Sequence, residues 1–486
     1  MSDRSSPSTT AKQGNWWART CGGREVLVLA LPLMISTASW AVMHFVDRMY
    51  LLWYSSDAMA AALPAGMLHF TILCFPLGIA TYVNTFVAQY NGAGRHDRIG
   101  LAVWQGVRVG LLAMPLFLVA IPFAPWLFSL VGHESKVMEL EVVYFQVLSV
   151  GAGGAVMSAA MSAFFTGRGQ TRVVMAVDCS ATLMNGVLDY LWIFGHLGFS
   201  EMGIEGAAWA TVVSQWFKAI VYWRLMMRAP YRQRYGMVTG RRYDAALFRR
   251  LLRFGGPNGL QMLVEVSAFT LFVFLVGGIS RDAMITTTIA LNVSSATFVP
   301  LLGLGVAVST IVGRQLGRNR SDLAARATWT AMTLATAYTG VTAAFYLLVP
   351  DLFLIGFAHA NNFEQLHATA VVLLRFVAAY CLLDAMNIVF HSAIKGAGDT
   401  RFILITTIFS STMLVSAVWT GLWLMGWGLY WCWSVITVWI FLLGSIYCAR
   451  FLHGGWRNMR VIESELIEPT TAEPLSDAIA TDSVTV

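Results

Sequence analysis

The stretch VAQYNGAGRHD at residues 87–97 has a counterpart, VGRQLGRNRSD, at residues 312–322, so that corresponding residue numbers differ by 225. The same difference relates Pro32 in LALPLM to Pro257 in FGGPNG. Glycine and basic residues recur in many short cytoplasmic loops, but chance recurrence does not explain a constant register. The match therefore indicates that the chain contains two copies of one structural unit.

Two further landmarks extend this internal repeat. Leu77-Gly78 corresponds to Leu302-Gly303 in the same register, and FTGRGQTR at 165–172 corresponds to IKGAGDTR at 394–401 in a register shifted by only four positions. Duplication of a six-helix unit is the simplest explanation. Because six is an even number of crossings, both units should have the same orientation and be related by an axis along the membrane normal.

The composition is that of a membrane protein. Of the 486 residues, 57% are hydrophobic and only 12% are charged, whereas soluble domains carry about 25% charged residues. Apolar runs long enough to cross about 30 Å of hydrocarbon recur along the chain. We therefore expect an all-α membrane protein with twelve spans, near residues 25–54, 60–89, 100–128, 140–166, 172–195, 203–227, 249–278, 284–315, 322–348, 365–394, 400–425 and 427–450.

Loop charge predicts the orientation. Nine arginines lie between Arg224 and Arg253, and other basic residues gather in the N-terminal segment and the even-numbered connections. The odd-numbered connections hold only Lys136 and Arg281, so both termini should be cytoplasmic. We expect, in order, a cytoplasmic tail, an N-terminal six-helix lobe, a basic cytoplasmic linker, a C-terminal six-helix lobe and a disordered tail, at residues 1–24, 25–228, 229–248, 249–453 and 454–486.

Several classes of function are disfavoured. The arginines are dispersed between apolar segments, which does not suggest nucleic-acid binding, and the six cysteines have no CxxC or other metal-like spacing. The chain contains no GxxxxGK[ST], GxSxG or HExxH motif, so neither an ATP-driven pump nor an intramembrane enzyme is expected. We expect a monomer in the lipid bilayer that handles small molecules and needs no cofactor besides a coupling ion.

Two carboxylates lie deep in apolar runs of the second half, Glu265 in GLQMLVEVSAF and Asp384 in YCLLDAMNIVF. A carboxylate near the bilayer centre costs about 2.5–3.5 kcal/mol on insertion scales, so it usually faces a cavity or a partner. Glu265 lies 12 residues after Arg253. Asp384 lies three helical turns before Lys395, so both acids should be about 17 Å from the cytoplasmic ends of their helices. Tyr380 lies one turn before Asp384, and we expect the two acids to share a cation or a proton.

The first half contains a second polar set. Asp47 ends the apolar stretch of the first expected span, and Asn185 and Asp189 share one face of the fifth. Thr211 lies in the sixth span. Carboxylate, amide and hydroxyl oxygens are hard ligands that suit Na⁺, and protonation of Asp47 is the alternative. Arg48 directly follows Asp47 and either snorkels to the interface or pairs with an acid of this set.

Further motifs follow one another in a fixed order: LALPLM at 29–34, FVDRMYL at 45–51, FVAQYNGAGR at 86–95, TGRGQTR at 166–172, NGVLD at 185–189, GIEGAAWATVVS at 203–214 and IALNVSSATFVPLLGLGVAVSTIVGRQLG at 289–317. On this ordered set the chain resembles the multidrug and toxic compound extrusion (MATE) family, in its NorM-like branch, within the MOP flippase superfamily. The resemblance implies two six-helix bundles in a V around a central cleft. It also implies a cation site at Glu265, Tyr380 and Asp384, and in other members a cation or proton site at the positions of Asp47, Asn185, Asp189 and Thr211.

The function expected from this resemblance is secondary antiport. The protein should export small cationic or amphipathic compounds from the cell in exchange for Na⁺ or H⁺ across the inner membrane. A flippase for a lipid-linked sugar, from the same superfamily, is the alternative, but it would need several buried arginines where this chain has acids. Acids in both lobes leave the coupling lobe and the coupling ion open.

Overall fold

The computed structural model describes residues 16–129, 133–354 and 363–463, and regular structure within these ranges is helical. The helices of the first half are α1 (Gly23–Tyr54), α2 (Ser56–Thr81), α3 (Val83–Gly92), α4 (Asp97–Ala120), α5 (Ala124–Ser129), α6 (Ser135–Gly167), α7 (Thr171–Phe194) and α8 (Ile204–Met226). A short helix α9 (Ala229–Arg234) lies between the halves. Those of the second half are α10 (Ala245–Gly277), α11 (Arg281–Gly317), α12 (Ser321–Leu348), α13 (Pro350–Leu354), α14 (Phe363–Ala397), α15 (Thr400–Trp423) and α16 (Leu429–His453).

Most of these helices suit a membrane. In the described residues, ten are long and apolar enough to cross one, with α2 and α3 forming a single crossing. The long helices α7 and α8 complete the twelve-helix layout and are more polar, because they carry residues such as Asp178, Asn185 and Lys218. The expected spans agree with these helices to within a few positions at each end. The prediction of an all-α, twelve-helix membrane protein is confirmed.

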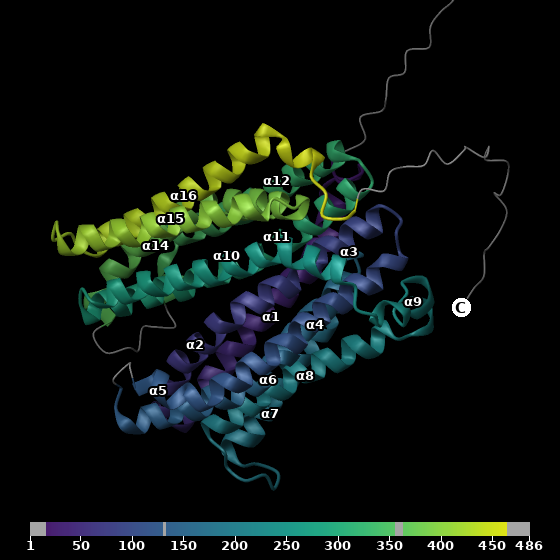
Figure 1. The fold of residues 1–486 in the computed structure, drawn as a ribbon. Coiled ribbons are helices and arrows are strands. Elements are labelled where there is room, and N and C mark those ends of the chain that lie inside the picture. Colours follow the sequence, from purple (N-terminus) through teal and green to yellow (C-terminus); the bar gives the residue numbers. More distant parts are fainter. Residues whose placement is uncertain (1–15, 130–132, 355–362, 464–486) are drawn as a thin grey trace, which may run out of the picture.

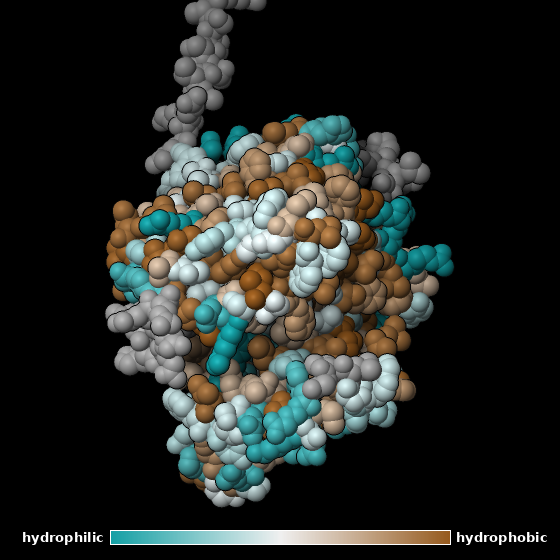
Figure 2. Space-filling view, turned by 90° about the vertical axis from the view of Figure 1, so that its left-hand side faces the viewer, coloured by the Kyte–Doolittle hydropathy of each residue, from teal (hydrophilic) through white to brown (hydrophobic). Residues whose placement is uncertain are grey.

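The outer surface is apolar, as a lipid-facing surface must be. Leu183 is 72% exposed, Phe274 70% and Ile405 68%, which water would not tolerate on so many large side chains. Figure 2 looks onto the end of the molecule that lies away from α9. Hydrophobic residues cover much of both flanks there, and hydrophilic residues gather in the lowest part of the view. The chain is therefore a multi-pass membrane protein.

The two halves form two bundles that lie side by side (Figure 1). They come together at the end where α3 and α9 lie, and they diverge toward the opposite end. We call the first end the basic end, because the connections at residues 93–96, 227–244 and 318–320 carry many arginines there, and the other the open end. The bundles touch through α1 with α11, α2 with α10 and α3 with α11.

The contacts between the bundles repeat with the register of the sequence. A Cβ on Gly78 would lie 2.5 Å from the Cα of Gly259, and a Cβ on Gly303 would lie 2.5 Å from the backbone nitrogen of Met34. Each of the four residues is related to its counterpart by the register of the internal repeat, Gly78 to Gly303 and Met34 to Gly259. Such reciprocal contacts are what a two-fold relation between the bundles produces.

A second reciprocal pair shows the direction of the two-fold axis. A Cβ on Gly92, at the end of α3, would overlap the carbonyl oxygen of Arg314 on α11. A Cβ on Gly317, at the end of α11, would overlap the carbonyl oxygen of Gln89 on α3. The equivalent helices α3 and α11 therefore end at the same side of the molecule. The two halves have the same orientation, as the even number of crossings predicted.

The segment after α16, residues 454–463, folds back over the basic end, and we call it the strap. Trp456 and Val461 are completely buried in it. Arg250 of α10 donates to the carbonyl oxygens of Val461 and Ile462, at 2.5 and 3.2 Å, and the side chain of Gln89 accepts from the Val461 amide at 2.8 Å. The expectation that disorder begins at residue 454 is wrong for these ten residues, because apolar side chains and backbone groups find partners there. Residues 464–486 lie outside the described residues.

Glu463 joins the strap to the opposite bundle. It accepts a hydrogen bond from the Tyr90 hydroxyl at 2.7 Å and forms ion pairs with Arg95 and Arg98, at 3.5 and 3.3 Å. Burial acts to raise its pKa, but the Tyr90 hydrogen bond and the charge of Arg98 outweigh burial, so the pKa of Glu463 lies below its usual value. A lowered pKa means that attachment is stabilised at neutral pH and weakens only as the pH falls through that lowered pKa. The strap therefore ties the two bundles together under ordinary conditions.

Glu463→Gln is expected to loosen the basic end. The change keeps the shape but removes the charge, and a partly exposed charge-assisted contact is worth about 1 kcal/mol, or roughly fivefold in the population of the closed arrangement. Distances between spin labels on the α3–α4 and α11–α12 connections measure that population. Asp322→Asn, which removes an exposed acid paired only with Arg320 on its own bundle, is the control. Equal distances in Glu463→Gln and wild type at neutral pH would contradict this role of the strap.

Candidate functional site

The structure brings Asp47 and Asp189 together in the N-terminal bundle. Asp47 lies on α1 and Asp189 on the adjacent α7, and the two carboxyl groups are near enough to act directly on each other. Both are buried, with Asp47 4% and Asp189 0% exposed. Two buried carboxylates this close repel each other when both are ionised, and one proton shared between them removes that repulsion. Binding of a cation is the other way to satisfy such a pair.

Asn185 lies one turn before Asp189 on the same face of α7 and is completely buried. Neither its amide nitrogen nor its amide oxygen has a partner among the described residues. One oxygen of Asp47 and both oxygens of Asp189 also have no hydrogen-bond partner among the described residues. Buried polar groups normally find partners, so this cluster has the free oxygen atoms that a small hard cation or a water-bound proton requires.

Three further residues of the N-terminal bundle, His44, Arg48 and Thr211, lie near the Asp47–Asp189 pair but do not enclose it. His44 Nδ1 lies 3.9 Å from an Asp47 carboxylate oxygen. Arg48 is exposed and forms no ion pair with another described residue, as expected of a snorkelling side chain. Thr211 is half-buried on α8, and in the described part of the chain no hydrogen bond connects its hydroxyl to Asp47 or Asp189. The structure thus brings Asp47 and Asp189 together with Asn185 one turn from Asp189, and it gives Thr211 no hydrogen bond to either acid among the described residues.

The acids of the C-terminal bundle lie near one another but not in contact. Asp384 on α14 is 6% exposed and accepts a hydrogen bond from the Asn387 side chain at 3.2 Å. Glu265 on α10 is half-buried and accepts a hydrogen bond from Gln261. The two carboxylates lie close enough for each charge to act on the other. No hydrogen bond joins them among the described side chains, so this pair is looser than Asp47 and Asp189.

Tyr380 and Lys395 complete the C-terminal surroundings in ways that spacing did not predict. The Tyr380 hydroxyl is hydrogen-bonded to Ser294 and still close enough to Asp384 for its charge to act on it, and its ring stacks on Trp433 with centroids 6.4 Å apart. Lys395 was placed at a helix end by its sequence position, but it is close enough to Glu265 to act on its charge. Glu265 therefore has a basic neighbour, whereas Asp384 has an amide.

Sequence reasoning missed one intramembrane acid, Asp178 on α7. Its carboxylate accepts hydrogen bonds from the Ser36 hydroxyl and, at 3.3 Å, from the Tyr222 hydroxyl. The signal was present, since Asp178 interrupts the apolar run VVMAVDCSATLM and lies three helical turns before Asp189. No Lys, Arg or His of the described residues lies within ion-pair distance of it.

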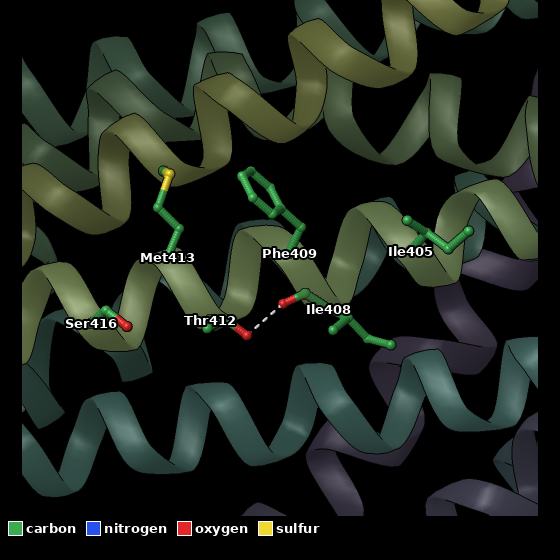
Figure 3. Close-up of a pocket in the computed structure, with 6 residues that line it drawn as sticks. All are labelled: Ile405, Ile408, Phe409, Thr412, Met413 and Ser416. Atoms are coloured by element: carbon green, nitrogen blue, oxygen red, sulfur yellow. Dashed lines mark hydrogen bonds between the residues drawn. The ribbon is translucent and has the colours of Figure 1, made fainter.

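One apolar cavity lies away from these acids. It has a volume of about 580 Å³ and lies along α15, lined by Ile405, Ile408, Phe409, Thr412, Met413 and Ser416 (Figure 3). The Thr412 hydroxyl donates to the Ile408 carbonyl oxygen of its own helix at 2.8 Å, so it offers no directed polar contact. Such an apolar groove on the exposed face of a membrane helix suits lipid chains. The described residues also contain no cluster of three His, Cys, Asp or Glu side chains able to ligate a metal.

Comparison with known proteins supports one family assignment. The sequence profile of the MatE family matches residues 32–191 and 257–419, with one match in each half of the chain. The multidrug resistance protein PmpM of Pseudomonas aeruginosa is 27% identical over 390 residues, which cover 80% of this chain and 81% of that protein. A probable multidrug resistance protein NorM of Pasteurella multocida is 25% identical over 393 residues, covering 79% and 83%.

Solved structures show the same fold. An outward-facing multidrug resistance MATE transporter of the MOP superfamily superposes with a TM-score of 0.81 at 19% identity, covering 89% of this chain and 95% of that one. A MOP superfamily transporter from Pyrococcus furiosus, whose title refers to reverse polarity of its binding pocket, has a TM-score of 0.79 at 20% identity, covering 90% and 97%. At such identities these likenesses establish the fold alone.

Proposed function

The chain is a member of the MatE family, and from that premise we propose that it is a secondary active antiporter that exports small cationic or amphipathic compounds in exchange for Na⁺ or H⁺. Relatives named as multidrug resistance proteins support export as the direction and drug-like compounds as the cargo. The observation that carries the proposal is the buried, closely spaced pair of Asp47 and Asp189 inside a membrane bundle. Such a pair must hold a proton or a cation, and releasing it to one side is the elementary step of coupling.

In this proposal the two bundles have different roles in transport. The acids of the C-terminal bundle, Glu265 and Asp384, lie near the bundle interior and attract a cationic compound or a competing coupling ion. The tight pair in the N-terminal bundle binds the coupling ion itself. We place the basic end at the cytoplasm by the positive-inside rule, in the inner membrane, with a monomer as the working unit and no further cofactor. The compound and the ion then move in opposite directions as the bundles open at alternate ends.

The test is transport by purified protein in liposomes, with Na⁺ and pH gradients imposed separately. Uphill movement of a fluorescent cationic dye is expected under at least one gradient and should stop when that gradient is collapsed. Asp57→Asn, which removes an exposed acid paired with Lys136 at 2.6 Å, should transport normally. Dye movement that neither gradient drives would refute antiport.

The lipid-linked sugar flippase is not favoured. A pyrophosphate group needs several buried basic side chains, whereas Asp47, Asp189, Glu265 and Asp384 put acids in both bundles and Lys395 is the basic neighbour of one of them. The same liposomes loaded with a fluorescent lipid-linked sugar would show protein-dependent flipping if the alternative held.

A further inference from the structure

Helices α1 and α7 pack in parallel with one constant register. Ser36 on α1 contacts Asp178 on α7, and Asp47 contacts Asp189, so the two pairs have the same separation in sequence. Between them the Thr182 hydroxyl donates to the carbonyl oxygen of Ser39 at 3.2 Å. The contact between the two helices is therefore polar along three turns.

Polar side chains follow one another along α7 on the side that faces α1. Asp178, Thr182, Asn185 and Asp189 occur at intervals of four, three and four residues, which is the spacing of one helix face. Neighbours at that spacing lie about 5–6 Å apart, a distance that one water or one rotamer change bridges. Asn185 is completely buried, and its amide has no partner among the described residues. An amide with free donor and acceptor between two acids is suited to a hydrogen-bonded chain.

The environment of Asp178 suits a proton better than Na⁺. Ser36 and Tyr222 each place a hydroxyl on one of its carboxylate oxygens. A hydroxyl donates to an ionised carboxylate and accepts from a protonated one, so a proton is accommodated by turning one hydroxyl. Sodium would need further oxygen ligands around this carboxylate, and no other described side chain hydrogen-bonds to it. The titratable and charged groups that α1, α6 and α8 bring to this side of α7 are His44, Asp47, Arg48, Tyr144, Lys218 and Tyr222.

We propose that Asp178 is a second proton-binding station, through which the proton of the Asp47–Asp189 pair passes on its way to the basic end. The pair gives up its proton through the hydrogen-bonded chain at Asn185 and Thr182, and the carboxylate of Asp178 takes it up. Asp178 lies seven residues, or about 10 Å, from the start of α7 at Thr171 and is only half-buried, so water receives the proton there. The inference rests on the proposed antiport and assigns its proton route.

The following experiment distinguishes a proton-carrying role of Asp178 from a purely structural role in hydrogen bonding to Ser36 and Tyr222. In liposomes, Asp178→Asn is expected to reduce uphill dye export driven by a pH gradient at least tenfold, while the dye Kd stays within twofold of wild type. Asp178→Glu should recover most of the rate. Ser36→Ala and Tyr222→Phe remove the same hydrogen bonds but keep the acid, and each should lose less than threefold.

Different results would overturn different claims. If Ser36→Ala and Tyr222→Phe lose as much as Asp178→Asn, or if Asp178→Asn keeps the wild-type rate, Asp178 is a structural contact and the relay is wrong. If wild type responds to a Na⁺ gradient alone, the relay fails while antiport stands, and if wild type responds to neither gradient, antiport itself fails. Asp178→Ser, whose hydroxyl keeps one hydrogen bond, replaces Asp178→Asn in the test should the latter not fold.

Discussion

Glu265→Gln and Asp384→Asn are each expected to reduce gradient-driven export by about 100-fold or more, while the protein stays folded. Each change removes a charge but nearly preserves shape, and Asn387 can still hydrogen-bond an amide at position 384, where it now donates to the carboxylate at 3.2 Å. A cationic compound and a coupling ion compete for the negative charge of these two acids, so removing either acid removes the competition that couples the two movements. Liposome transport under imposed gradients measures the effect.

Folding measurements and control variants show whether a loss of export comes from the lost charge or from a damaged fold. Size-exclusion chromatography and thermal unfolding of each variant report whether the fold survives, and Asp57→Asn, an exposed acid outside both bundles' interiors, should keep the wild-type rate. Glu265→Gln also leaves Lys395 without its acidic neighbour, so Glu265→Asp, which keeps the charge, is the matched comparison. Wild-type export by both neutral variants under either gradient would show that the C-terminal acids are structural. Coupling would then belong to Asp47 and Asp189 alone.

Gly92→Ala and Gly317→Ala are expected to prevent full closure of the basic end. The added Cβ would overlap the carbonyl oxygen of Arg314 or of Gln89, and a helical backbone oxygen cannot move aside as a flexible side chain can. Overpacking of this kind costs about 1–3 kcal/mol, which shifts a two-state population roughly five- to 150-fold. Because the two contacts are equivalent under the repeat, the two variants should shift the population in the same direction and by similar amounts.

Spin-label distances across the basic end and dye transport together measure this effect. Both variants should show longer distances between the α3–α4 and α11–α12 connections, together with slower export. Gly256→Ala is the matched control, since Gly256 lies in α10 and its added Cβ would meet no atom within 4 Å. Normal closure in Gly92→Ala would mean that the bundles approach less closely in the membrane than these contacts require.

The positions of Glu265 and Asp384 along their helices could be derived from the chain alone. A residue count and a rise of about 1.5 Å per residue placed both acids at one depth, and they do act on each other's charge. The hydrogen-bond partner of Tyr380 could not be derived, because one turn of separation from Asp384 shows only a shared face. The hydroxyl bonds to Ser294 of a different helix, and no spacing within α14 contains that information.

The sequence by itself determined the class of the protein, its twelve helices and the duplication, because hydrophobic length, loop charge and register are properties of a single chain. Only the tertiary structure decided which side chains meet. It paired Asp47 with Asp189, placed Asp178 between Ser36 and Tyr222, brought Lys395 to Glu265 and held the strap on the opposite bundle through Glu463. These contacts depend on the rotation of each helix about its axis and on the identity of its neighbours, which packing between distant segments determines and linear spacing does not.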